Sequence, residues 1–195
     1  MARTATVART TGETEIEITV NLDGTGESRI STGVGFFDHM LTALARHSLI
    51  DLDISVKGDT WVDDHHTVED TGIALGQALR QALGDKRGIR RFGDAIVPLD
   101  EALIMAAVDI SGRGELYWDV PIGPDKVGTF DTELGHEFFC GFARDAGITL
   151  HLREMCGTNA HHILEATFKA CARALRVAVE PDPRVTGIPS TKGSL

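Results

Sequence analysis

The pattern His65-His66-Thr67-Val68-Glu69 returns 96 residues later as His161-His162-Ile163-Leu164-Glu165, with both histidines and the glutamate in the same places. Apolar side chains at helical spacing follow each copy, so each copy is predicted to begin a long helix. Apolar and polar residues alternate before each copy, over 50–56 and 148–152, which predicts a half-buried strand. The same elements around the same five-residue pattern indicate that the chain is duplicated.

The other predicted elements also follow one order in both halves. In the first half they are a strand over 2–9, a hairpin of strands 16–22 and 27–32, a short helix over 37–44, the strand over 50–56 and a helix from 65 that ends at Gly84. In the second half they are a strand over 91–98, a hairpin of strands 103–110 and 115–120, a short helix near 138–142, the strand over 148–152 and a helix from 161.

These elements predict an α+β protein made of two duplicated half-domains. Each half is expected to hold a roughly four-stranded sheet with two helices on one face, and the helices of the two halves are expected to pack together between the sheets. The chain is therefore interpreted as one domain of two repeats, about 1–87 and 88–180. Residues 181–195 lack periodicity and are rich in proline, glycine, serine and threonine, so a C-terminal tail is expected there.

Composition restricts the class of protein. The chain has 195 residues, 29 of them acidic and 19 basic, and its formal net charge of −10 makes nucleic acid an unfavourable partner. No apolar run approaches the roughly 20 residues that span a bilayer, and the first residues lack the apolar core of a secretory signal. We expect a cytoplasmic protein without membrane contact. Its three cysteines have no metal-like spacing and are expected to be reduced core residues.

The repeated motif has the geometry of a metal site. Residues four apart share one face of a helix, so His65 and Glu69 can hold one ion, whereas His66 points about 100° away and must serve a second centre. The second copy of the motif repeats this arrangement. Both copies begin a helix, and the positive dipole end there favours the neutral, ligand form of imidazole. Two motifs therefore predict two metal centres, within one subunit or shared between subunits.

Further ligands are expected on the two short helices. His39 lies on the first helix, and either His136 or Glu137 lies on the second. Nitrogen and carboxylate ligands without thiolates suit manganese, iron, cobalt or zinc, and spacing does not choose among them. Residues 136–140 begin like the zinc-protease pattern but end in cysteine instead of the second histidine, which excludes that class. The remaining histidines are interpreted as surface or structural residues, and these are His47 and His151.

Basic residues beside predicted turns form the remaining polar signal. Arg90 and Arg91 precede Phe92, Arg113 lies in the second hairpin turn, and Ser190-Thr191-Lys192-Gly193 lies in the tail. Arginine together with serine and lysine donors fits a phosphate group. The glycines form no strand-then-helix dinucleotide fingerprint, so no nucleotide is expected.

Together these residues resemble the imidazoleglycerol-phosphate dehydratase family of histidine biosynthesis, and the similarity covers essentially the whole chain. The matching segments are residues 32–41, 63–70, 88–93, 109–113, 161–170 and 189–193. The resemblance implies two similar α/β halves with their helices packed between two sheets, a fold like that of domain 2 of ribosomal protein S5. It also implies two manganese ions per active site at subunit interfaces, and a large homo-oligomer, which is a 24-mer in the family.

The resemblance further implies a lyase that removes water from D-erythro-imidazole glycerol phosphate and yields imidazole acetol phosphate. The hydrogen that is lost sits on a carbon that is not acidic by itself. A metal ion on one ring nitrogen would lower the pKa of the other ring N–H, and the resulting imidazolate could expel the hydroxyl group.

Residue-wise comparison with the family implies a role for each matching position. The implied metal ligands are His39, His65, His66, Glu69, Glu137, His161, His162 and Glu165. The implied substrate and phosphate contacts are Arg91, Arg113, Lys169, Ser190 and Lys192. The implied catalytic carboxylates are Glu13, Glu69 and Glu165, with Glu13 reaching the reacting carbon. Many relatives carry histidine where this chain has Glu137, so His136 stays open as an alternative metal ligand. Of the adjacent arginines Arg90 and Arg91, Arg90 is the less favoured phosphate contact.

Two other functions fit parts of the pattern. In a metal-binding structural or storage protein, the histidine and glutamate clusters would join subunits through metal ions. The basic residues would then be surface residues without a binding role. A two-metal hydrolase acting on a phosphate ester would need its metals about 4 Å apart. The diverging adjacent histidines argue against so close a pair.

Overall fold

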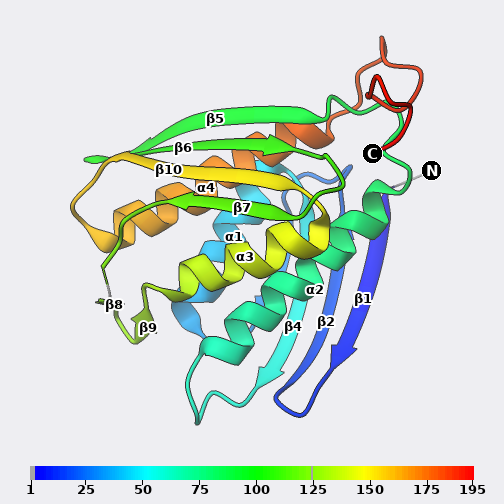
Figure 1. Cartoon of the computed structure of the whole chain (residues 1–195). Coiled ribbons are helices and arrows are strands. Elements are labelled where there is room, and N and C mark those ends of the chain that lie inside the picture. The colour runs from blue at the N-terminus through cyan, green and yellow to red at the C-terminus, as the bar shows by residue number, and fades with distance from the viewer. Residues whose placement is uncertain (1–2, 124) are drawn as a thin grey trace.

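The computed structural model describes residues 3–123 and 125–195, and in this part of the chain two four-stranded sheets enclose four helices (Figure 1). The helices are α1 (Gly35–Ser48), α2 (His65–Leu83), α3 (Leu134–Ala146) and α4 (Ala160–Val179). The first sheet has the order β1 (Thr4–Thr10), β2 (Thr14–Asn21), β4 (Asp51–Gly58), β3 (Ser28–Ser31). The second has the order β5 (Phe92–Leu99), β6 (Ala102–Asp109), β10 (Thr149–Cys156), β7 (Glu115–Asp119).

The two sheets have the same topology. In each, the first three strands of the spatial order are antiparallel and the last strand lies parallel to its neighbour. This confirms the predicted α+β fold of two similar halves. The strand expected over 2–9 runs from Thr4 to Thr10, and residue 2 lies outside the described residues. Two short strands that the sequence analysis did not predict, β8 (Lys126–Val127) and β9 (Phe130–Asp131), precede α3.

The predicted hairpins are wrong in both halves. β4 lies between β2 and β3, and β10 lies between β6 and β7, so the strands on either side of each predicted turn do not pair. Alternation of apolar and polar residues fixes the buried face of a strand but not its neighbour. In the first half Asp51, at the start of β4, accepts the backbone N–H groups of three loop residues at 2.8–3.0 Å, and this keeps the loop before β3 against β4.

The helices of the two halves form one middle layer. α2 packs mainly against α3, and α1 against α4, so each helix pair joins the two halves. Gly72 allows the close approach of α2 and α3, because a Cβ atom there would lie 2.4 Å from the carbonyl oxygen of Phe138. The core continues between the sheets through aromatic rings such as Phe138 and Phe168, whose centroids are 5.1 Å apart.

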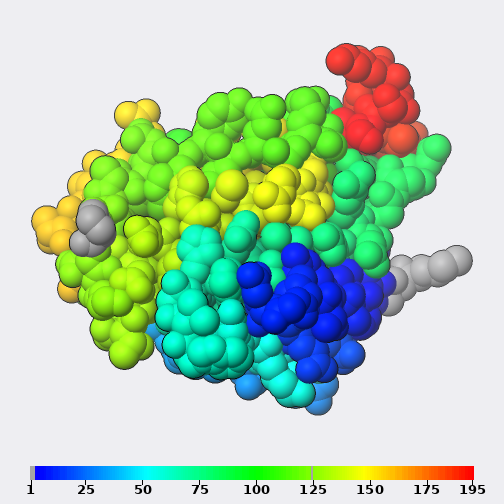
Figure 2. All heavy atoms as spheres, turned by 60° about the horizontal axis from the view of Figure 1, so that its bottom comes forward, coloured from blue at the N-terminus to red at the C-terminus, as the bar shows by residue number. Residues whose placement is uncertain are grey.

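The tail follows α4 and lies at one end of the molecule, where it meets the segment before β5 (Figures 1 and 2). Ile89 forms an isolated β-bridge with Pro181, and Arg91 donates a hydrogen bond to the carbonyl oxygen of Pro189 at 2.8 Å. Of the cysteines, Cys171 is buried as expected and Cys140 is partly buried, but the expectation is wrong for Cys156, which is exposed at the end of β10, where the strand register is irregular. None of the helices in the described residues is long and apolar enough to cross a membrane.

Candidate functional site

Three predicted ligands converge where α1 meets the start of α4. Glu165 Oε2 lies 3.0 Å from His161 Nε2, one helical turn away, and 3.4 Å from His39 Nε2 on α1. One ligand atom from each of the three side chains lies within 4.8 Å of the others. Asn159 caps the helix, since its side chain accepts the backbone N–H of His161 at 2.9 Å, which fixes the first turn. Two imidazoles and one carboxylate are a donor set for a divalent transition metal.

Electrostatics keep Glu165 in its carboxylate form. Burial by itself raises the pKa of this group, but Lys169 Nζ lies 2.7 Å from Oε1, and the two histidines also donate to it. The net effect lowers the pKa of Glu165 to about 2. Lys169, which is predicted to contact the substrate or its phosphate group, therefore lies directly against a candidate metal ligand.

The α2 motif forms a looser pair. His65 Nε2 lies 3.7 Å from Glu69 Oε2, and in the described residues no third side chain joins this pair as closely as His39 joins the α4 pair. Glu137 occupies the place on α3 that His39 occupies on α1, directly before two consecutive buried residues. His136 Nδ1 lies 2.9 Å from Glu137 Oε1, so the two alternatives for this ligand are neighbours in space as well as in sequence.

The second histidine of each motif points away from these clusters, as the helical geometry predicts. His66 Nδ1 lies 3.1 Å from a carboxylate oxygen of Asp59, and His162 Nδ1 lies 2.7 Å from Glu101 Oε2. These hydrogen bonds raise the pKa of both histidines. Glu13 Oε1, from the turn between β1 and β2, lies 3.6 Å from His66 Nε2.

Neither Asp59 nor Glu101 was predicted from the sequence to belong to the site. Asp59 directly follows β4 and Glu101 directly precedes β6, so each is a carboxylate at the end of a strand. An acidic residue at a strand end next to a histidine motif is a weak signal, because acidic residues are common in turns. Only the packing of the strands against the helix starts brings these side chains to the histidines.

The candidate phosphate contacts gather around Asp109 at the end of β6. Arg91 donates from Nε at 2.7 Å and from Nη2 at 3.2 Å to its carboxylate, and Arg113 Nη2 lies 3.6 Å from it. The tail brings Ser190 next to this group, because the carbonyl of the preceding residue accepts from Arg91. Lys192 is exposed in the tail.

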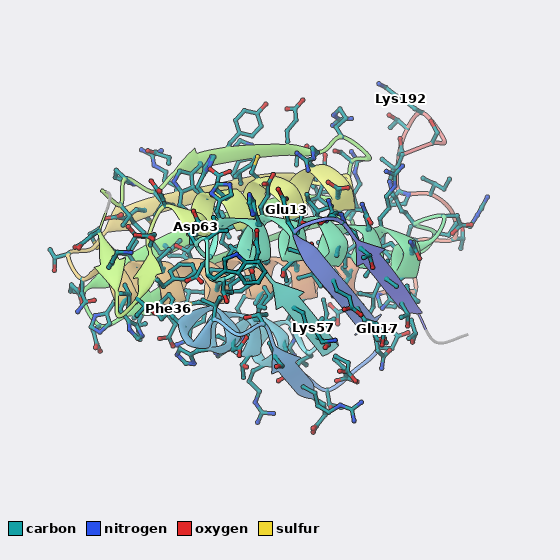
Figure 3. The ribbon with its side chains drawn as sticks, turned by 90° about the horizontal axis from the view of Figure 1, so that it is seen from below. Glu13, Glu17, Phe36, Lys57, Asp63 and Lys192 are labelled. Carbon is teal, nitrogen blue, oxygen red and sulfur yellow. The ribbon has the colours of Figure 1, made fainter. Side chains whose placement is uncertain are left out.

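Within one chain these basic residues lie far from the α4 cluster. The backbone N–H of Arg91 donates to the carbonyl oxygen of Ala178 at 2.9 Å. Ala178 is 13 residues after Glu165 on α4, a rise of about 20 Å at 1.5 Å per residue. In Figure 3 Lys192 lies in the tail at one end of the molecule, away from Phe36, whose ring centroid is 5.2 Å from that of His161 in the α4 cluster.

His47 and His151, interpreted as surface or structural residues, lie outside both the α4 cluster and the basic group around Asp109. His151 stacks on Tyr117 on the outer face of the second sheet, with ring centroids 4.3 Å apart. Burial lowers the pKa of His47, near the end of α1, and the positive charge of Lys169 adds to this effect.

Comparison with known proteins agrees with the fold and the motifs. A sequence model described as imidazoleglycerol-phosphate dehydratase matches residues 32–175. The enzyme of that name from Gluconacetobacter diazotrophicus is 65% identical over 195 residues, covering 100% of this chain and 98% of the relative. The one from Granulibacter bethesdensis is 63% identical over 196 residues, covering 100% of both chains.

Solved structures give the same result. The crystal structure of imidazoleglycerol-phosphate dehydratase from Staphylococcus aureus is similar with a TM-score of 0.84 at 41% identity, over 92% of this chain and 99% of that one. The Pyrococcus furiosus enzyme in complex with (S)-C348 has a TM-score of 0.84 at 40% identity, over 97% and 100% of the two chains. The storage-protein and hydrolase alternatives are therefore set aside, and the chain belongs to the imidazoleglycerol-phosphate dehydratase family of enzymes.

Proposed function

We propose that the chain catalyses the manganese-dependent dehydration of D-erythro-imidazole glycerol phosphate to imidazole acetol phosphate in L-histidine biosynthesis. Family membership supports the reaction, and the convergence of His39, His161 and Glu165 within 4.8 Å is the observation that carries the metal dependence. These nitrogen and carboxylate donors, without a thiolate, fit manganese. When bound, the metal would lower the pKa of the substrate ring N–H and so help the hydroxyl group to leave.

Two centres per active site follow from the internal repeat. His39 with His161 and Glu165 would hold one ion. The equivalent positions in the other half are Glu137 with His65 and Glu69, and the packing of α2 on α3 parallels that of α1 on α4. His66 and His162 point away from both of these ligand sets. Each would therefore bind a metal ion whose other ligands come from another subunit.

The active site is proposed to need several copies of the chain. Imidazole glycerol phosphate has only three carbons between its ring and its phosphate group, far too few to bridge the separation of about 20 Å between the α4 cluster and the Arg91 group. A ring held by one subunit and a phosphate held by another would remove this mismatch. This supports a large homo-oligomer, such as the 24-mer of the family, with its sites at subunit interfaces.

The chain's own side chains would divide the remaining work. Arg91 is held rigidly by Asp109, whereas Arg113 is 62% exposed and free to turn toward a phosphate. Ser190 and Lys192 would supply further donors from the tail. Glu13, which lies beside His66, would take the proton from the reacting carbon, so that this hydrogen and the hydroxyl group of the neighbouring carbon leave together as water.

Turnover of imidazole glycerol phosphate by chelator-stripped protein, with and without added manganese, tests this proposal. We expect activity to return with manganese and to fall at least about 100-fold in Glu69→Gln, which keeps the size of the side chain but removes a charged ligand. Glu17→Gln, on the exposed outer face of β2, is the matched control and should keep full activity. A fully metallated, assembled protein that leaves the substrate unchanged would refute the proposal.

A further inference from the structure

The second histidine of each motif is held through the same ring atom by a carboxylate from another element. His66 Nδ1 lies 3.2 and 3.1 Å from the two oxygens of Asp59. His162 Nδ1 lies 2.7 Å from Oε2 of Glu101. Asp59 follows the third strand of its sheet order, whereas Glu101 precedes the second, so the two halves reach the same contact from non-equivalent positions.

This contact decides which ring nitrogen carries hydrogen. An ionised carboxylate only accepts hydrogen bonds, so Nδ1 must be the donor and the lone pair of the neutral ring is left on Nε2. Nε2 in turn faces a second carboxylate, Glu13 at 3.6 Å from His66 and Asp100 at 3.7 Å from His162. A lone pair and a carboxylate oxygen repel each other unless a proton or a metal ion lies between them.

Both orienting carboxylates are themselves fixed. Asp59 is only 8% exposed, and its backbone N–H donates to the carbonyl oxygen of Glu13 at 3.1 Å. Glu101 uses its other oxygen, Oε1, to accept the backbone N–H groups of Asn159 at 2.8 Å and Thr158 at 3.2 Å. Each carboxylate can therefore impose an orientation on its histidine, instead of following it.

We propose that Asp59 and Glu101 are positioning residues, each of which locks its histidine in the Nδ1–H tautomer and so makes Nε2 the metal-binding atom. Carboxylates that orient a ligating histidine in this way typically contribute 10–100-fold to metal affinity. The proposal rests on the proposed metal function, but the tautomer itself exists without metal and can be measured separately.

The first test is solid-state 15N NMR of the metal-free, full-length protein labelled in its histidine rings, at pH 9, which is well above the ordinary pKa of histidine of about 6.5. Asp59→Ala should convert one histidine to a mixture of tautomers, and Glu101→Ala should convert a different one. His66→Gln and His162→Gln identify the two signals by their loss. Asp59→Asn keeps an acceptor oxygen that can face Nδ1 and should retain the Nδ1–H form. Glu101→Gln should lose it, because the amide oxygen would keep the two backbone N–H groups and the amide NH2 would face Nδ1 as a donor. Unchanged tautomers in both alanine variants would overturn the proposal.

The second test is a manganese titration of the same proteins, with the free ion followed by electron paramagnetic resonance. We expect each alanine variant to bind manganese about 10–100-fold more weakly at one class of site, with the other class unchanged. Glu17→Ala, an exposed carboxylate on β2, should bind like the wild type. Unchanged affinity in both alanine variants would also overturn the proposal. A wild-type protein that shows the tautomers but binds no manganese would refute the proposed manganese dependence, whereas the assignment of the tautomers to Asp59 and Glu101 would stand.

Discussion

At the residue scale, Asp51 shows how one carboxylate places a loop. Its Oδ1 atom accepts the N–H groups of Thr25, Gly26 and Glu27, and its other oxygen accepts from Asn21 at 3.1 Å. Burial raises its pKa, but these backbone and side-chain donors outweigh that effect, so the net pKa lies below the ordinary value of 3.8. Four donors on one carboxylate make this side chain the link between β4 and the loop that leads to β3.

We predict that Asp51→Ala lowers the free energy of unfolding by about 1–2 kcal/mol at pH 7. Because the pKa is lower in the folded chain, the carboxylate stabilises the fold above pH 4, and this contribution disappears as the pH falls through the folded pKa. Urea unfolding at pH 7, 5 and 3 should therefore show a difference between variant and wild type that shrinks toward pH 3. Asp53→Ala, whose carboxylate pairs with the exposed Arg29, should cost much less at pH 7. Equal losses in the two variants would contradict the prediction.

At the scale of elements, the contact between α2 and α3 depends on glycine. A Cβ atom at Gly72 would lie 2.4 Å from the carbonyl oxygen of Phe138, and one at Gly76 would lie 2.6 Å from that of Phe142. Both neighbours are backbone atoms, so no side chain can move aside. This contact also sets the distance between the His65 pair on α2 and Glu137 on α3.

We expect Gly72→Ala and Gly76→Ala each to lower the free energy of unfolding by about 1–3 kcal/mol, although alanine by itself favours a helix over glycine by about 1 kcal/mol. Thermal and urea unfolding of the metal-free protein would measure this. Gly35→Ala is the matched control, because it is also helical and has no atom within 4 Å of the added Cβ. A Gly72→Ala protein with a higher free energy of unfolding than the wild type would contradict the prediction, because α2 and α3 would then be able to move apart without loss of stability.

At the scale of the whole molecule, the exposed side chains next to the His66 motif indicate where another copy approaches. Trp61 is 84% exposed and Val62 is 61% exposed. Both lie in the turn that Asp59 closes by accepting the N–H of Val62 at 2.8 Å. Since His66 follows this turn and is proposed to complete a centre on another subunit, the turn should lie in that interface.

We therefore predict that manganese added to stripped protein shifts the fluorescence of Trp61 to shorter wavelength as the mass of the assembly rises. Trp118 is half-buried against Phe139, with ring centroids 6.0 Å apart, and its emission is removed in the Trp118→Phe variant. Emission and light scattering recorded together test this, with Trp118→Phe keeping the shift and Trp61→Phe losing it. Assembly without any change in the emission of Trp61 would place the interface elsewhere.

The spacing of residues along the chain is enough to predict the faces of the strands, the two long helices, the internal repeat and the residue types of the metal motif. Each of these follows from the spacing of residues that are close in sequence. His161 and Glu165, for example, are four positions apart and therefore lie on the same face of a helix. The resemblance to a family added roles for single residues, which stay predictions for the metal ligands and the phosphate contacts.

Which strands are neighbours, and which distant side chains meet, depends instead on how the elements pack in three dimensions. His39 and Glu165 are 126 positions apart, and they meet because α1 packs on α4. Asp59 and Glu101 reach their histidines for the same reason, through strand ends that lie against helix starts. Local spacing carries no information about such contacts, because they depend on how the apolar faces of separate elements pack together.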